Sequence, residues 1–125
     1  MNISANVRRM LVLFSFIATV GIFSSCEKYT YNPPAVDPNE EWNLSTDIQP
    51  IFTANCISCH GGRVSPDLRA GQSFNSLTKG NYVDEPAVSS RLYLQISTDS
   101  DHQKLLTEAD RLRILYWIEQ GAENN

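Results

Sequence analysis

The chain has 125 residues, with 10 basic and 14 acidic side chains and a formal net charge of −4. This length favours one small domain. A nucleic-acid partner is not expected, because binding phosphates requires a basic stripe that this acidic chain does not have.

The first 25 residues have the pattern of an export signal. Arg8 and Arg9 precede an apolar run over residues 10–23, which is short for a membrane span and suits a signal-peptide core. The segment 23–26, which ends at Cys26, resembles the cleavage box of bacterial lipoproteins. We therefore interpret residues 1–25 as a lipoprotein signal peptide and Cys26 as the lipidation site. An ordinary secretory signal and a retained N-terminal anchor are the alternatives.

Residues 26–44 are predicted to form a flexible linker behind this lipid anchor. They contain three prolines and have neither a helical nor a strand period, which favours an extended path. Trp42 and Leu44 are the residues of this segment most suited to packing on the domain that follows, residues 45–122. Without residues 1–25 the chain keeps 8 basic and 14 acidic side chains, a formal charge of −6, so we expect a partner with a basic docking surface.

A first helix is predicted to begin near Thr46, because Thr46 and Gln49 have the spacing of a capping box. Pro50 is compatible with the first turn of a helix. The apolar residues that follow have helical spacing and form one face: Ile48, Ile51 and Phe52. This helix leads directly into Cys56.

Three further helices are predicted downstream. A short helix is expected within residues 68–77, and a second within residues 91–96 after a cap at Ser89 or Ser90. A strand is the alternative for residues 91–96, but no partner strand is visible elsewhere. The last helix has Thr107 as its N-cap, with Asp110 in the capping-box position, and Gly121 follows its end. Residues 124–125 are expected to fray.

Residues 56–60 read Cys-Ile-Ser-Cys-His, which is the attachment signature of a c-type haem. In such sites the two thiols, here Cys56 and Cys59, become thioethers on the porphyrin, and the histidine, here His60, binds the iron as its proximal ligand. The two glycines that follow allow the backbone to turn away beneath the porphyrin.

Two other uses of these residues are less compatible with the sequence. A thioredoxin-like redox pair should follow a strand and open a helix, whereas here a helix precedes the pair and glycines follow it. A zinc site built from Cys56, Cys59, His60 and His102 would require the neighbouring residues 59 and 60 to reach one tetrahedral ion. The chain also has no carboxylate pair, serine–histidine pair or phosphate loop, and we expect no enzyme activity.

The haem motif, the segment 47–52 before it, Ser90 with Leu92, and the tail from Trp117 to Ala122 together resemble single-haem class I cytochrome c domains. The resemblance is greatest to the planctomycete-type domains of exported bacterial lipoproteins and covers about residues 45–122. It implies a small all-α fold around one covalently bound haem, with Phe52 and Trp117 where the first and last helices cross. It also implies electron transfer between redox proteins. The protein is then expected to be membrane-anchored and to face the periplasm or cell surface, with the outer membrane favoured over the inner.

In that family a methionine normally supplies the sixth iron ligand, but the two methionines of this chain are Met1 and Met10, both in the predicted signal peptide. His102 is the second histidine of the chain and the candidate distal ligand, which would lower the reduction potential relative to methionine. The alternatives are a five-coordinate iron, water or Lys104. An open sixth site would indicate a haem-based ligand sensor instead. Four residues are candidate partners of the haem propionates: Arg63, Asn81, Tyr82 and Arg91.

Overall fold

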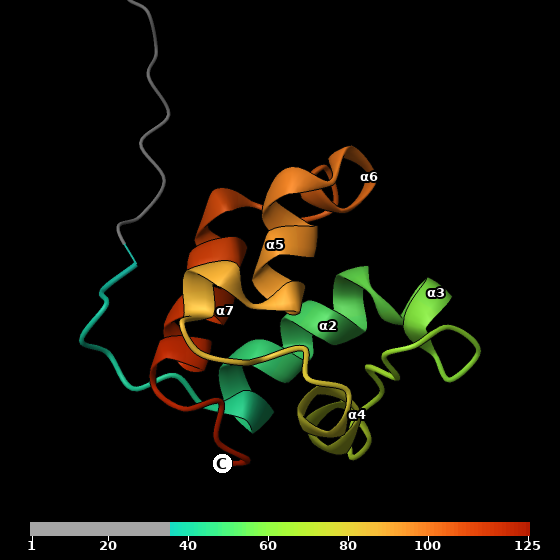
Figure 1. Ribbon diagram of the computed structural model, residues 1–125, viewed down its shortest axis with the longest axis horizontal. Helices are drawn as coiled ribbons and strands as arrows, with labels where there is room; N and C mark the ends of the chain where they lie inside the picture. The colour runs from blue at the N-terminus through green and yellow to red at the C-terminus, as the bar shows by residue number, and fades with distance from the viewer. Residues whose placement is uncertain (1–35) are drawn as a thin grey trace, which may run out of the picture. The chain divides into compact units, whose positions relative to one another are not determined.

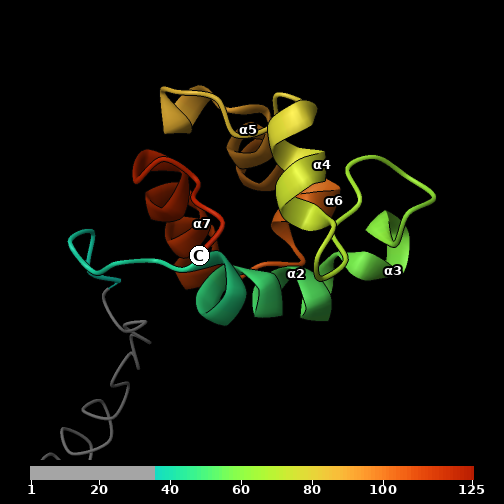
Figure 2. The ribbon, with the colours of Figure 1, turned by 90° about the horizontal axis from the view of Figure 1, so that it is seen from below.

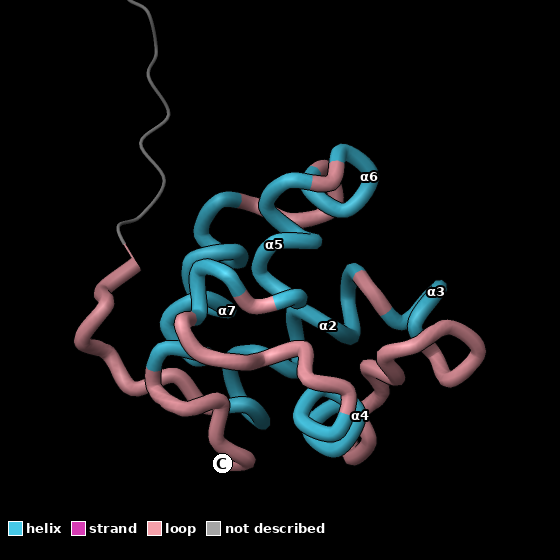
Figure 3. Tube along the Cα trace, in the orientation of Figure 1, coloured by secondary structure: helices cyan, strands magenta, loops and turns pink. Residues whose placement is uncertain are grey.

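The computed structural model describes residues 36–125; Cys26 and the predicted signal peptide lie outside the described residues. The described part consists of helices and loops without a strand (Figure 3), so the all-α prediction is confirmed for it. Among the described residues, no helix has both the length and the apolar character needed to cross a membrane. In chain order the elements are a π-helical turn η1 (Leu44–Ile48), α2 (Gln49–Asn55), α3 (Ile57–His60), α4 (Ser73–Lys79), a 3-10 turn η2 (Ala87–Ser89), α5 (Arg91–Thr98), α6 (Ser100–Gln103) and α7 (Glu108–Glu119).

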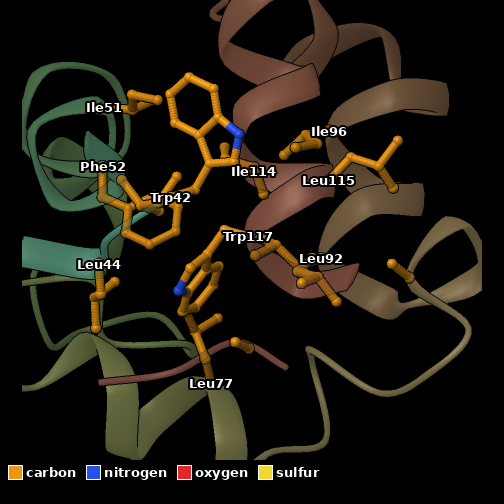
Figure 4. Packing of buried hydrophobic residues seen from close by; sticks show 14 of the residues in the cluster. Trp42, Leu44, Ile51, Phe52, Leu77, Leu92, Ile96, Ile114, Leu115 and Trp117 are labelled. Carbon is orange, nitrogen blue, oxygen red and sulfur yellow. The ribbon is translucent and has the colours of Figure 1, made fainter. Parts of the chain in front are cut away.

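One apolar core joins these elements. Figure 2 shows α2 along one edge of the described part, with α7, α5 and α4 gathered over it, and α3 at the end of α2 that is far from α7 (Figure 1). Phe52 of α2 and Trp117 of α7 are each about 1% exposed and belong to the same buried cluster (Figure 4). Both side chains are therefore core residues, and the helix-crossing position implied for them by the resemblance stays a prediction.

The start of the first helix differs from the prediction. The helix begins at Leu44 with Asn43 as its N-cap residue, and the capping box of Thr46 and Gln49 does not form. Asp47 instead accepts hydrogen bonds from the Asn43 backbone N–H and the Thr46 hydroxyl, both at 2.9 Å. Trp42 and Leu44 are buried, as expected for the residues most suited to packing. Burial of these two side chains fixes the chain onto the core before Thr46 is reached, which moves the helix start earlier.

The C-terminal residues were expected to fray, and this expectation is wrong for Asn125. Its side-chain and backbone oxygens accept the N–H groups of Leu44 and Ser45 at 2.8 and 3.0 Å. These backbone N–H groups belong to the first turn of a helix, where backbone donors have no acceptors within the helix itself. Gly121 ends α7 with a φ of +100°, as predicted for a glycine in this position, and so directs the chain back toward η1.

The middle of the chain is helical in the regions expected, with different bounds. The helix α4 begins at Ser73, because Asp67 and Arg69 form a turn ahead of it in which Arg69 donates its backbone N–H to the Asp67 carboxylate. Residues 91–98 form α5 rather than a strand, and the Ser90 hydroxyl accepts the Tyr93 N–H. Thr107 caps α7 as predicted. The short helix α6 was not predicted.

Candidate functional site

The cysteine–histidine motif lies where α2 passes into α3. Cys56 ends α2, and its carbonyl oxygen accepts the backbone N–H groups of Cys59 and His60 at 3.2 and 2.9 Å. The three functional side chains are therefore carried on one short turn. Gly61 and Gly62 then redirect the chain, and Gly62 has a φ of +94°, a conformation that favours glycine.

A cavity of about 480 Å³ opens beside this turn. Its volume lies within the range of about 300–1,000 Å³ that is usual for small-molecule and cofactor sites. Cys56, Cys59 and His60 line it, and so do Gln95 and His102 from α5 and α6. Much of the remaining wall is buried and apolar, with side chains from the core: Phe52, Leu68, Leu92, Ile96, Leu106 and Ile114 (four of them labelled in Figure 4).

The imidazole of His60 is oriented by the loop that follows the motif. Its Nδ1 lies 3.1 Å from the carbonyl oxygen of Pro66, and the His60 carbonyl oxygen accepts the Leu68 N–H at 2.8 Å. A carbonyl oxygen can only accept, so Nδ1 carries a proton, and in the neutral imidazole the lone pair lies on Nε2. This is the arrangement in which a histidine is ready to bind a metal through Nε2.

The imidazole of His102 is held in a comparable way by a carboxylate. Its Nδ1 lies 2.7 Å from Oδ1 of Asp99, the N-cap residue of α6. The hydrogen bond from the His102 side chain, followed by that from the His102 backbone N–H, lowers the pKa of the Asp99 carboxyl. An ionised carboxylate accepts only, so here too Nδ1 is the donor, and in the neutral imidazole the lone pair lies on Nε2. The side-chain amide nitrogen of Gln95 lies 3.2 Å from the same Nδ1, but both atoms are donors in this arrangement and make no hydrogen bond with each other.

The two histidines, 42 positions apart in the sequence, are brought together across the cavity. Their ring centroids are 6.3 Å apart. An imidazole nitrogen binds a metal ion at about 2.0–2.1 Å, and adding roughly 1 Å from nitrogen to ring centre on each side gives about 6 Å for two rings bound to opposite faces of one ion. The spacing therefore fits one iron between His60 and His102. With two thiols beside an apolar cavity, these residues could hold a covalently attached haem.

The cysteines do not have the features of a redox pair. Burial raises the pKa of the Cys56 thiol to about 11, whereas reactive pairs of this spacing depend on a lowered thiol pKa.

Within residues 36–125 no group of three or more His, Cys, Asp or Glu side chains is arranged to hold a metal ion.

The other candidates from the sequence are divided between the cavity and the surface. Tyr82 and Arg91 line the cavity, with the Arg91 guanidinium 4.3 Å above the Tyr82 ring. Arg63 and Asn81 do not belong to its lining. Lys104, the alternative sixth ligand, also lies outside the lining and is paired with Asp101 at 2.7 Å.

The sequence analysis did not predict the residues that orient the two imidazoles. Pro66 is six positions after His60, and nothing in the sequence indicates that its carbonyl oxygen returns to the ring. Asp99 had a readable signal, because an aspartate three residues before a histidine is the spacing of an N-cap and the third residue of a helix. That signal would have predicted α6, although not the position of α6 beside the haem motif.

Comparisons of this chain with protein-family models, with curated proteins and with solved structures found no match.

Proposed function

We propose that residues 45–122 carry one covalently attached haem and transfer single electrons between redox proteins. The observation that carries the proposal is the orientation of His60. Its Nδ1 is bound to the Pro66 carbonyl oxygen, which leaves Nε2 for a metal ion, and it lines an apolar cavity together with both thiols of the motif.

Each group has a distinct role in this proposal. Cys56 and Cys59 would hold the porphyrin through thioether bonds, and His60 would bind the iron on one face. When bound, the haem supplies the one-electron change in oxidation state. The buried apolar wall would lower the local dielectric constant on its side of the haem, which makes the reduction potential sensitive to nearby charges. His102 would bind the opposite face.

The proposed setting of the domain comes from the sequence. Cys26 would be lipidated after removal of residues 1–25, so that the domain is tethered to a membrane and faces the periplasm or cell surface, with the outer membrane favoured. The formal charge of −6 on the remaining chain favours a redox partner with a basic docking surface.

A haem-based ligand sensor is the second candidate function. It is favoured by the position of His102 on α6, which has four residues and none of them buried. A ligand on so small an element is easier to displace than one on a packed helix. Carbon monoxide binding distinguishes the two functions: a sensor should bind it rapidly at low concentration when reduced, and an electron carrier with two protein ligands should not.

The test is to produce the full chain in cells that attach haem to exported cytochromes. The wild-type protein should keep its haem through denaturation in detergent, and a reductive titration should follow a reversible one-electron curve. A Cys56→Ala/Cys59→Ala variant should lose the covalent haem, whereas Cys26→Ala should keep it and lose only the lipid. If the wild-type chain carries no covalent haem in cells that mature a control cytochrome, the proposed function is wrong.

A further inference from the structure

We propose that Asp99 positions His102 as the second axial ligand of the iron and that its negative charge lowers the reduction potential of the haem. This inference rests on the proposed function. It assigns to α6 a role that neither the haem motif nor the resemblance to methionine-ligated cytochromes provides.

Asp99 is fixed by several donors at once. Its Oδ1 accepts the backbone N–H groups of Asp101 and His102, both at 3.1 Å, and the His102 Nδ1–H at 2.7 Å. Two of these three contacts come from His102 itself, one from its backbone and one from its ring. Together they fix the ring relative to the helix that carries it, which reduces the side-chain entropy that His102 would lose on binding a metal.

The position of α6 brings this ring to His60. The C-terminal end of α5 lies directly before α6, and the Gln103 side chain donates to the Ser97 carbonyl oxygen at 3.0 Å. This bond and the single-residue connection at Asp99 attach α6 to α5, whose Leu92 and Ile96 are buried in the core. The separation of 6.3 Å between the two rings therefore rests on a packed helix.

The two histidines have unlike partners, and this difference predicts an electronic effect. His60 donates to the neutral carbonyl oxygen of Pro66 at 3.1 Å, whereas His102 donates to a carboxylate at 2.7 Å. A carboxylate partner raises the basicity of a metal-bound imidazole. The more basic ligand and the added negative charge both favour the oxidised iron, so the reduction potential should fall.

The chain offers a matched control for this charge. Asp101 is two residues away, with a side chain 81% exposed and paired with Lys104. Asp99→Asn and Asp101→Asn each remove one negative charge from α6 or its cap. Asparagine is also a good N-cap residue, so Asp99→Asn keeps the helix cap and an oxygen acceptor for the imidazole. If Asp99 had only a structural role, Asp99→Asn would preserve that role.

The experiment measures reduction potentials and oxidised-state spectra of the haem-loaded wild-type protein and variants. We expect Asp99→Asn to shift the one-electron equilibrium toward the reduced protein by at least tenfold, which corresponds to about 59 mV. Asp101→Asn should shift it by less than twofold. Asp99→Ser, which also keeps a cap, should shift the equilibrium in the same direction as Asp99→Asn. His102→Ala should convert the oxidised iron from low spin to high spin, and added imidazole should restore the low-spin spectrum.

Two results would overturn the inference. The first is a low-spin spectrum that is unchanged in His102→Ala, which would mean that His102 is not a ligand. The second is an equal shift of the reduction potential in Asp99→Asn and Asp101→Asn, which would mean that Asp99 acts only as a surface charge and not through His102. A wild-type chain without covalent haem is a separate outcome, detected before these measurements, and it contradicts the proposed function instead.

Discussion

Gln49 connects the helix that carries the haem motif to the loop that orients His60, and its removal should destabilise the protein. Its side-chain Nε2 donates to the Leu68 carbonyl oxygen at 2.9 Å, and its Oε1 accepts the Ser73 hydroxyl at 2.6 Å. Ser73 is 1% exposed. Gln49→Ala therefore removes these two hydrogen bonds, together with a longer, exposed one of 3.3 Å from Nε2 to the Thr53 hydroxyl, and leaves a buried hydroxyl without its Gln49 partner.

The expected cost follows from these contacts. Each net hydrogen bond contributes about 1 kcal/mol, and a buried polar group left unsatisfied costs about 1–3 kcal/mol. We expect Gln49→Ala to lower the free energy of unfolding by about 2–3 kcal/mol in total. For a domain of this size, the melting temperature should fall by roughly 10–20 °C.

A double-mutant cycle with Ser73→Ala, measured by urea unfolding of the protein, isolates the hydrogen bond between Gln49 and Ser73. The double variant should cost about 1 kcal/mol less than the sum of the single variants, because each single substitution already breaks the Gln49–Ser73 bond.

Thr46→Ala is the control for the capping box that the sequence suggested. A capping threonine is worth about 1 kcal/mol, but Thr46 is exposed and caps no helix, so we expect a cost below about 0.5 kcal/mol. A loss of about 1 kcal/mol in Thr46→Ala would contradict the absence of a capping role for Thr46. A loss below about 0.5 kcal/mol in Gln49→Ala would contradict the stabilising role of the Gln49 hydrogen bonds.

Three further predictions concern the last helix, the haem turn and the loop after it. Thr107→Ala should cost about 1 kcal/mol in thermal unfolding and Thr107→Ser close to nothing, because the hydroxyl caps α7; equal costs would exclude a capping role. A Cβ on Gly61 would lie 2.7 Å from the Ile57 carbonyl oxygen, so Gly61→Ala should destabilise the protein by about 1–3 kcal/mol and lower the covalent haem per protein, whereas an unchanged haem yield would contradict this. The Arg69 guanidinium holds the pKa of Asp67 below its ordinary value; the ion pair therefore stabilises the fold above about pH 3.9, and this contribution is lost as the pH falls through the lower, folded-state pKa. Arg69→Gln should raise that pKa in a carboxyl titration and weaken this acid dependence, and an unchanged titration would refute the pairing.

The sequence by itself determined the features that depend on neighbouring residues. The cap of α7 at Thr107, the glycine after α7 and the helix leading into Cys56 were all predicted, and the cap of α5 was narrowed to Ser89 or Ser90, because each depends on a few residues within one or two turns. The all-α class was implied by the resemblance to class I cytochrome c domains, and the described part confirms it.

The tertiary structure alone decided what depends on contacts between distant residues. The first helix begins at Leu44 because Trp42 and Leu44 are buried and because Asn125 accepts its first donors. The Pro66 carbonyl oxygen reaches the His60 ring only when the loop folds back. Likewise, His102 comes within 6.3 Å of His60 only because α5 packs on the core and carries α6 with it. Local sequence patterns carry no information on the distance between residues far apart in the chain, since the packing of the whole core determines that distance.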